Sequence, residues 1–415
     1  MKVKKEQEFI PIILASDINA YSMARAFHEE YHIKSIILAR FNRGTVNHSK
    51  ILEIRLLPNI DEPDCFVSEL EKLYEELKPL NKKLILIGCA DHYVRLIVNN
   101  SDKLKDKFIL PYTNIDTLNK IVLKETFYEL CEENNIDYPK THVYKKGDSL
   151  NFKLDFDYPV ILKPSDSVAY FKMNYKGQYK VYTIHDKKEL DSTLKTIYDH
   201  GYTGNMIIQD KVPGRDNRMY DLHVFCGKNK KVQYMNLGNV LLEEHTPKGL
   251  GSNAATITTY NPELMNKIKN LLEKIGYQGW CDCDLKYDER DGKIKIFEIN
   301  ISQGRSHYRN TGSGYNVAKF IVDSFVYNKD KEKETIFVKE PYFWHVIPKR
   351  IVLKYVEDKE KVAEVKKLIK EKKVCHSLFY KGDKSILRFA YLIVRNIKQF
   401  TKYKKYYYVD GQIEE

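Results

Sequence analysis

The chain has 415 residues, a hydrophobic content of 43% and a formal net charge of +12. This length supports two or three domains with cores of their own, and the composition is typical of a globular protein. No apolar run approaches the ~18–20 residues of a membrane span, and the first residues (MKVKKEQEF) lack the apolar core of a signal peptide. The seven scattered cysteines indicate a reduced, cytoplasmic protein.

The first part of the chain alternates between strand-like and helix-like segments. Strands are predicted at 8–15, 33–39 and 83–88, and helices at 18–31 and 67–77. This order predicts a parallel α/β domain over residues 1–118. No G-x-G-x-x-G sequence follows the first strand, so a dinucleotide site of the Rossmann type is not expected.

Three polar residues of this domain follow predicted strands. In parallel sheets ligands bind beyond the carboxyl ends of the strands, which makes Asp17, Asn19 and Asp91 candidate substrate contacts. Helix capping is the more ordinary role for the two aspartates, and Ser16-Asp17 has the composition of a cap. Both roles stay open at this point.

From residue 115 the composition shifts toward a mixed α+β pattern. An amphipathic helix is predicted at 118–134, a strand at 158–167 that carries Lys163, a helix at 186–200 and a strand at 206–216 that enters the turn Pro213-Gly214 before Asp216. A lysine within an apolar strand is poorly explained as part of a solvated face, and a long amine directed at a phosphate explains it better.

Further along, the pattern leads to a predicted hairpin. A strand at 232–242, a small-residue loop at 245–256 and a helix at 261–275 precede it, and a closing helix is predicted at 312–326. The hairpin occupies 279–309, with its turn at Asp291-Gly292. Cys281 and Cys283, on its first strand, are expected to pack in the core.

Three oxygen-bearing side chains of this hairpin are candidate metal ligands. Glu298 and Asn300 are two residues apart and therefore leave the same face of a strand, and Asp284 can lie opposite them. Two carboxylates and an amide oxygen are ligands that suit Mg²⁺. A hairpin with a merely solvated polar face is the alternative.

Several residues and motifs follow one another along this part of the chain: Lys124, Lys163 within VILKPSD, IIQDKVPGRD, Asp284 and Glu298-x-Asn300. Together they resemble the ATP-grasp superfamily over residues 119–325. With DINAYSMARAFHEEY, LIGCADHYVRLIV and EINISQGRSHYR included, the chain is most similar to carboxylate–amine ligases of the D-aspartate ligase type. The resemblance implies an N-terminal parallel α/β domain (1–118), a small ATP-grasp lobe (119–204), a central lobe with the metal site (205–328) and a basic C-terminal extension (329–415).

The resemblance also implies roles for single residues. Lys124 and Lys163 would hold ATP phosphates, the Gln209–Val212 backbone (including Asp210) would bracket adenine, and Asp216 would bind the ribose. Asp284, Glu298 and Asn300 would bind two Mg²⁺ ions. Arg305 and Lys163 would act in catalysis by offsetting charge, with Arg305 at the carboxylate or acyl phosphate.

The chain departs from the superfamily pattern at three places. Lys120 competes with Lys124 for the role of the first phosphate-binding lysine, because the Asp-Lys dipeptide that is usual in the superfamily is absent. The loop after Lys163 is poor in glycine, which leaves Ser165 and Ser167 uncertain as phosphate contacts. Asp282 stands where D-alanine ligases have a basic residue, a charge that Arg305 or Arg309 could replace.

Three functions compete at this stage. The first is an ATP-dependent ligase that joins a carboxylate to an amine through an acyl phosphate, for example D-aspartate to a nucleotide-linked peptidoglycan precursor. The second is a ligase of the same fold that makes a dipeptide or another natural-product amide. The third is a non-catalytic nucleotide-binding protein, which the complete ligand set disfavours. His307 and Asp17 are both candidates for the general base that removes a proton from the amine.

The C-terminal region carries much of the positive charge. Residues 341–415 contain 18 Lys/Arg and 9 Asp/Glu, a difference of 18 − 9 = +9. A strand at 342–356, a charged helix at 360–372 and an apolar segment at 385–400 with basic flanks are predicted. This segment either packs on the ligase core with a solvated basic rim or contacts an anionic membrane, in which case the cytoplasmic protein is membrane-peripheral. No stable nucleic-acid partner is expected.

Overall fold

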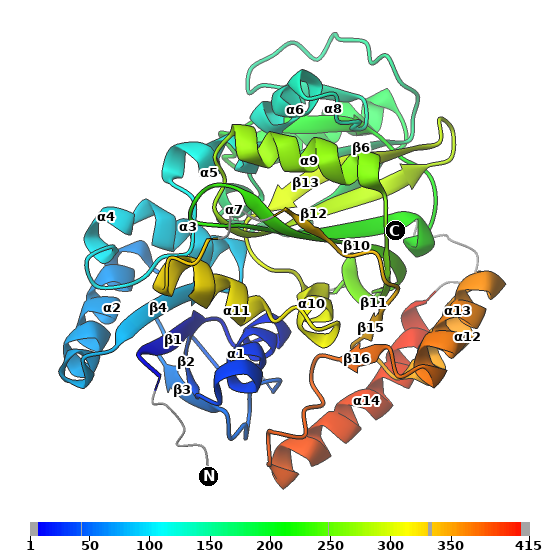
Figure 1. The fold of residues 1–415 in the computed structure, drawn as a ribbon. Coiled ribbons are helices and arrows are strands. Elements are labelled where there is room, and N and C mark those ends of the chain that lie inside the picture. The colour runs from blue at the N-terminus through cyan, green and yellow to red at the C-terminus, as the bar shows by residue number, and fades with distance from the viewer. Residues whose placement is uncertain (1–6, 43, 248, 331–333, 408–415) are drawn as a thin grey trace.

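The computed structural model describes residues 7–42, 44–247, 249–330 and 334–407, which form three β-sheets with helices packed around them (Figure 1). The predicted small-residue loop includes residue 248, and the basic C-terminal extension continues past 407, so parts of both lie outside the described residues. The predicted fold class, a mixed α/β and α+β architecture, is confirmed, because one sheet is parallel and the other two are mainly antiparallel.

The N-terminal sheet is parallel and has the strand order β3-β2-β1-β4. The apolar run FIPIIL forms its inner strand β1, whose residues are almost all buried, as expected for a parallel strand covered on both faces. The strands of this sheet are β1 (Phe9–Leu14), β2 (Ser35–Ala39), β3 (Leu52–Leu56) and β4 (Lys83–Gly88). The helices of this part are α1 (Ile18–Tyr31), α2 (Pro63–Leu77), α3 (Asp91–Asn99) and α4 (Ser101–Leu104), with a short 3₁₀ turn at Lys78–Leu80.

A second sheet is antiparallel, has the order β5-β8-β6-β7 and lies at the top of Figure 1. Its strands are β5 (Thr141–Tyr144), β6 (Val160–Pro164), β7 (Tyr182–Ile184) and β8 (Met206–Asp210). The helices of this stretch of chain are α5 (Ile115–Val122), α6 (Lys124–Glu133), α7 (Ser167–Phe171) and α8 (Lys187–Asp199). This sheet has a small apolar core of its own.

The largest sheet runs through the middle of the molecule in the order β13-β12-β9-β10-β11-β15-β16, with β14 paired to β10. Its strands are β9 (Met219–Cys226), β10 (Val232–Glu244), β11 (Ser252–Thr259), β12 (Gly279–Asp288), β13 (Lys293–Asn300), β14 (Ile336–Phe337), β15 (Phe343–His345) and β16 (Val374–His376). The associated helices are α9 (Pro262–Lys274), α10 (Tyr308–Gly312), α11 (Val317–Ile321), α12 (Lys349–Tyr355), α13 (Lys359–Lys370) and α14 (Ile386–Tyr406), together with 3₁₀ turns at Asp216–Arg218 and Arg305–His307 and a π-helical turn at Val322–Val326.

The predicted helix 118–134 is wrong as a single element, because the chain forms two helices, α5 and α6. Leu123 between them has an extended backbone (φ −81°, ψ 122°). The Thr126 hydroxyl lies 3.0 Å from the carbonyl oxygens of Lys120 and Leu123, which gives the end of α5 a polar partner. The break places Lys124 at the first position of α6.

Three other predicted elements also differ. The loop at 245–256 is shorter, because β11 begins at Ser252 and pairs with β10. The closing helix at 312–326 is interrupted near Gly314, whose φ of +100° ends α10, and a new cap at Asn316 begins α11. The predicted strand 342–356 is only three residues long, because Pro348 stands at the start of α12.

One apolar core connects distant parts of the chain. It contains residues of β1 and α1, of α11, and of the C-terminal segment including α12, α13 and α14. The C-terminal region therefore packs against the N-terminal sheet and the large sheet through shared apolar contacts. The domain bounds 118, 204 and 328 stay predictions.

Candidate functional site

The three predicted metal ligands lie on the neighbouring strands β12 and β13. Asp284 is directly opposite Glu298, and the Asn300 amide donates from Nδ2 to Asp284 Oδ2 at 2.9 Å. A β-bulge follows Asp284, which locally changes the pairing of the two strands. The structure therefore brings the predicted ligand set together on one face of the hairpin.

Burial and neighbouring charges act oppositely on the two carboxyl groups. Burial raises the pKa of Asp284 to about 7, and the negative charge of Glu298 adds to this rise. Burial also favours the neutral form of Glu298, but Lys124, Lys180 and Lys163 outweigh it and hold the pKa of Glu298 below its ordinary value. The oxygen ligands fit Mg²⁺, since a divalent cation would compensate the repulsion that raises the pKa of Asp284.

Two of the converging lysines were predicted. Lys124 Nζ lies 3.1 Å from Glu298 Oε2, whereas Lys120 is exposed on α5, so the structure places Lys124 at the carboxylates. Lys163 Nζ on β6 lies 3.2 Å from the Tyr128 hydroxyl. Burial lowers the pKa of Lys163 to about 8, while Glu298 acts in the opposite direction.

A third lysine was missed by sequence reasoning. Lys180, between α7 and β7, has its Nζ 3.7 Å from Glu298 Oε1. It lies in a lysine-rich segment with Lys172 and Lys176, and nothing in the pattern distinguishes it from them. Lys124 at the start of α6 and Lys180 in the loop before β7 thus contact one carboxylate, and the charge of Lys163 on β6 also acts on it; three ammonium groups in this arrangement suit a polyphosphate.

The predicted adenine-binding strand is already engaged in other contacts. Gln209 Nε2 donates to the Tyr128 hydroxyl at 3.0 Å and to Thr141 Oγ1 at 2.9 Å. The N–H of Asp210 donates to the Lys140 carbonyl at 2.9 Å. Val212, which follows the strand, is buried.

The side chain of Asp210 holds the hairpin in place. It accepts from the Arg290 guanidinium at 3.0 and 2.6 Å, and Arg290 also pairs with the buried Asp288. This contact ties the second sheet to the turn between β12 and β13. The carboxylate of Asp210 therefore has a structural role.

The predicted ribose ligand Asp216 lies beside another acid that the sequence did not single out. Asp216 Oδ2 accepts from the Glu243 N–H and from His245 Nε2, both at 2.8 Å. Burial raises the pKa of Glu243 to about 8, and the charges of Asp216 and Asp284 add to this rise. Glu243 therefore lies within the electrostatic reach of both predicted sites.

Arg305, the predicted catalytic arginine, is ion-paired. Its Nη1 lies 2.7 Å from Glu244 Oε2, and the other oxygen of Glu244 lies 3.4 Å from Lys402 Nζ on α14. Burial opposes ionisation of Glu244, but Arg305 outweighs it and lowers its pKa to about 2. Arg305 thus reaches the end of β10 rather than the carboxylates of the hairpin.

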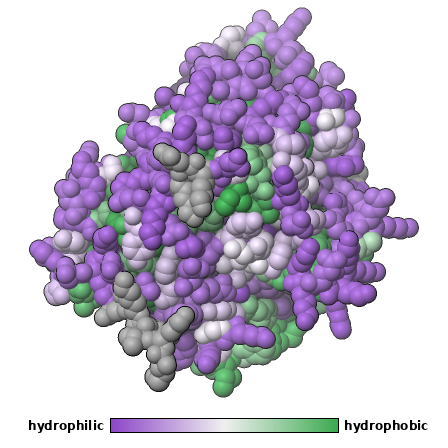
Figure 2. All heavy atoms as spheres, in the orientation of Figure 1, coloured by the Kyte–Doolittle hydropathy of each residue, from purple (hydrophilic) through white to green (hydrophobic). Residues whose placement is uncertain are grey.

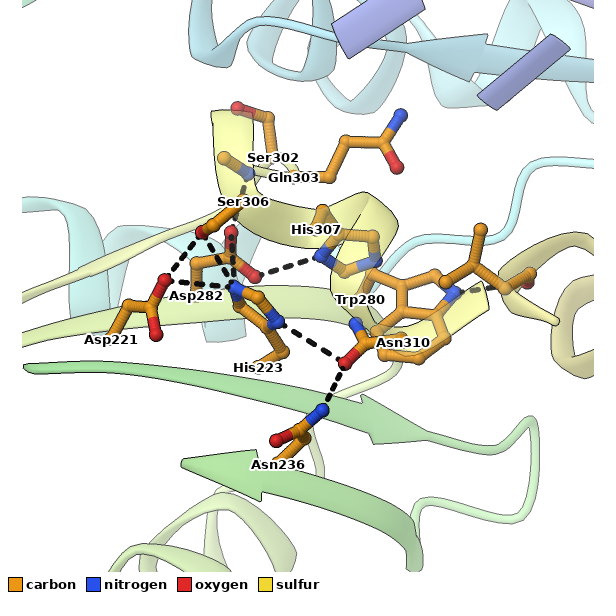
Figure 3. Close-up of polar contacts among 12 residues, drawn as sticks. Asp221, His223, Asn236, Trp280, Asp282, Ser302, Gln303, Ser306, His307 and Asn310 are labelled. Atoms are coloured by element: carbon orange, nitrogen blue, oxygen red, sulfur yellow. Dashed lines mark hydrogen bonds and ion pairs between the residues drawn. The ribbon is translucent and has the colours of Figure 1, made fainter. Parts of the chain in front are cut away.

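Beyond Asn300 lies a buried polar cluster around Asp282 (Figure 3). Asp282 accepts from the Gly304 N–H and lies 3.1 Å from His307 Nδ1. A side chain at position 304 would place its Cβ 2.6 Å from Asp282 Oδ2, so only glycine fits this approach. Ligand atoms of His223, Asp282 and His307 all lie within 4.8 Å of one another, and all three residues are buried.

Hydrogen bonds from neighbouring residues hold the side chains of this cluster in place. His223 contacts Asn310 Oδ1 at 3.2 Å and Ser306 Oγ at 3.1 Å. Arg309 is fully buried and pairs with Asp221 at 2.8 Å, which gives its guanidinium a carboxylate partner of its own. Within the described part of the chain, no lysine or arginine nitrogen lies within 4.0 Å of the Asp282 carboxylate.

The N-terminal sheet contacts the segment that follows the metal strand. Asn19 Nδ2 donates to the Gln303 carbonyl at 3.0 Å, and Ser302 Oγ donates to Asp91 Oδ1 at 2.6 Å. Asp17 accepts from two backbone N–H groups and caps α1, the more ordinary of its two predicted roles. Asp17 and His92 also line a surface pocket at the carboxyl ends of the strands.

Comparison with known proteins places these features in context. The chain is 35% identical over 413 residues to the D-aspartate ligase of Enterococcus faecium (strain Aus0004), with 98% of each chain covered. Its fold is similar to the L-amino acid ligase of Bacillus licheniformis (TM-score 0.57, 12% identity, 83% and 81% of the chains covered). It is also similar to the N5-carboxyaminoimidazole synthetase of Staphylococcus aureus complexed with ADP (TM-score 0.59, 13% identity, 82% of each). No family model matches.

Proposed function

The chain belongs to the D-aspartate ligase family of ATP-grasp carboxylate–amine ligases, and from this membership we propose that it joins an amino acid such as D-aspartate to an amine of a peptidoglycan precursor. It is an ATP-dependent ligase that forms carbon–nitrogen bonds. The observation that carries the assignment of the site is the meeting of Lys124, Lys163 and Lys180 at Glu298, opposite Asp284.

The reaction requires activation of the carboxylate. A carboxylate oxygen of the amino acid attacks the γ-phosphorus of ATP, the bond to the β-phosphate oxygen breaks, and ADP leaves. The amine nitrogen then attacks the acyl carbon of the acyl phosphate, inorganic phosphate leaves, and the nitrogen loses a proton. Lys124, Lys163 and Lys180 stabilise the phosphate charge by position rather than by covalent chemistry.

We propose that Asp284, Glu298 and Asn300 hold Mg²⁺, with two ions, as the resemblance to the ATP-grasp superfamily implies. Bound there, the metal would neutralise charge on the transferred phosphoryl group. Burial and, after it, the negative charge of Glu298 raise the pKa of Asp284 to about 7, and a divalent cation bound there would favour the ionised form of both carboxyl groups. The adenine contact near Val212 and the ribose contact of Asp216 are proposals of the same kind.

Proton removal from the amine is assigned to His307. Burial lowers the pKa of His307, so its imidazole is neutral and able to accept a proton at neutral pH. Asp17 caps α1 with its carboxylate and is the weaker choice. Arg305 would leave Glu244 for the carboxylate or acyl phosphate of the substrate.

Asp282 is proposed to recognise the amino group of the carboxylate donor. Its buried carboxylate is held by Gly304 and His307 and has no lysine or arginine partner among the described residues. A buried carboxylate is costly unless a cation compensates it. The ammonium group of an amino acid is such a cation, and a simple dicarboxylate lacks it.

The test measures ADP release with D-aspartate, L-aspartate, D-alanine and succinate, each with and without an amine acceptor. We expect amine-dependent ADP release with one amino acid and weak release with succinate. In Asp282→Asn the preference for D-aspartate over succinate should fall at least ~10-fold while KM for ATP stays unchanged.

The two parts of the proposal fail in different ways. Absence of amine-dependent ADP release with every donor would refute the assigned ligase reaction. An unchanged preference in Asp282→Asn would refute only the role of Asp282. We also propose a cytoplasmic location, where ATP and nucleotide-linked precursors are available.

A further inference from the structure

Helix α14 is fixed to the molecule by one face only. Its buried residues are Arg388, Leu392, Gln399 and Tyr403. Arg388 pairs with Asp383 at 3.1 Å, and the Tyr403 hydroxyl donates to the Glu243 carbonyl at 2.7 Å. These contacts hold the helix in a defined orientation.

The opposite face of α14 is apolar and exposed. Besides Tyr391, the exposed large apolar residues of the helix are Ile386, Leu387, Phe389, Ile393, Val394, Ile397 and Phe400. Five of the seven, Ile386, Phe389, Ile393, Ile397 and Phe400, recur at intervals of three and four residues, and Leu387 and Val394 each follow one of these five, so all seven share one side of the helix. Ile386 is 87% exposed and Ile397 62%, so these side chains are not partly buried edges of the core. Figure 2 shows hydrophobic atoms along the lower edge of the molecule, where Figure 1 places the first turns of α14.

The charged residues of the segment that forms this face are all basic. From 384 to 407 the sequence contains no aspartate or glutamate. Its basic residues are Lys384, Arg388, Arg395, Lys398, Lys402, Lys404 and Lys405. Of the lysines, four are exposed, at positions 384, 398, 404 and 405. An apolar stripe bordered by lysines is the composition of helices that lie in the interface of anionic bilayers.

We propose that α14 docks this face, composed of the seven apolar residues named above, on an anionic phospholipid surface, with the helix axis parallel to the bilayer. The described residues contain no helix that is long and apolar enough to cross a membrane, so contact with the surface is the geometry that remains for α14. The negative lipid headgroups supply the counter-charge for the lysines. A second copy of the chain fits less well, because pairing two such helices would bring the four exposed lysines of each against those of the other, and neither helix carries an acidic residue between 384 and 407.

The experiment uses the full chain and sedimented vesicles of two compositions, phosphatidylcholine alone and phosphatidylcholine with about one-third phosphatidylglycerol. We expect binding to the anionic vesicles that weakens with added salt, and little binding to the neutral ones. The variant Ile393→Glu/Ile397→Glu should bind anionic vesicles at least ~10-fold less. Both positions face solvent, so the fold and the ADP-releasing activity with soluble substrates should be retained.

A matched variant controls for general surface changes. Leu80→Glu also replaces a half-exposed apolar residue by a carboxylate, but it lies in the N-terminal part of the chain, and it should bind as the parent protein does. Failure of the parent protein to bind anionic vesicles, or equal binding by the Ile393/Ile397 variant, would overturn the proposal. A dimer in sedimentation velocity that the same variant converts to a monomer would assign the face to a second copy instead.

Discussion

Replacing Glu298 by glutamine tests the centre of the proposed site. The substitution keeps the shape but removes the charge that Lys124 contacts at 3.1 Å and Lys180 at 3.7 Å. Removing one positioned charge of this kind costs ~2.7–4 kcal/mol of transition-state stabilisation, so we expect turnover to fall at least ~100-fold. The pKa of Lys163 should fall further below about 8, because, of the two negative charges that raise it, Glu298 contributes more.

The assay is ADP release with saturating ATP, the amino acid and the amine, together with the pH profile of kcat/KM. The control is Glu289→Gln, a half-exposed glutamate on the same hairpin that pairs with Arg218. It should retain parental turnover, and both variants should show similar thermal unfolding. Near-parental ADP release by Glu298→Gln, or an unchanged alkaline limb of its pH profile, would refute the assignment of the site.

Three further outcomes are expected from the contacts above. Burial lowers the pKa of Lys163 to about 8, so kcat/KM for ATP should decline as pH rises through about 8, and Lys163→Arg should move this decline to higher pH; a pH-rate profile checks both. The pKa of Glu244 is lowered to about 2, so its stabilising contact with Arg305 is present above its ordinary pKa near 4.5 and lost as pH falls toward 2; the destabilisation by Glu244→Gln, ~1–2 kcal/mol in urea unfolding at pH 7, should therefore shrink in acid. Arg290→Ala removes the partner of Asp210 and one partner of the buried Asp288, and should lower the free energy of unfolding by ~1–3 kcal/mol, measured by denaturant titration.

The predicted parts of the site rest on local signals. Asp291-Gly292 and the alternation around it predict the hairpin, and the side-chain period of two then places Glu298 and Asn300 on one face. The turn alone does not fix which residue lies opposite Asp284, because the β-bulge after Asp284 shifts the pairing by one residue. The shared face of Glu298 and Asn300 therefore follows from the local sequence, whereas the position of Asp284 opposite Glu298 depends on the bulge.

The features that sequence reasoning missed depend on distant contacts. Lys180 reaches Glu298 across 118 positions of the chain, counted from their residue numbers, and resembles the neighbouring lysines in sequence. The break at Leu123 is by contrast a local feature: the Thr126 hydroxyl contacts the carbonyl of Leu123, a contact that the helical pattern of 118–134 does not reveal. For α14, apolar residues occur on both sides of the helix, and the contacts of Arg388 and Tyr403 decide which side remains exposed.

The close approach of Gly304 to Asp282 makes these two positions a single unit for protein engineering. The backbone of Gly304 has φ −78°, which any residue can adopt, so the restriction to glycine comes from the carboxylate and not from the chain conformation. A library that varies only position 304 would meet the same clash in every member. A side chain at 304 is accessible only when both positions are varied together, because a smaller residue at 282 makes room for it.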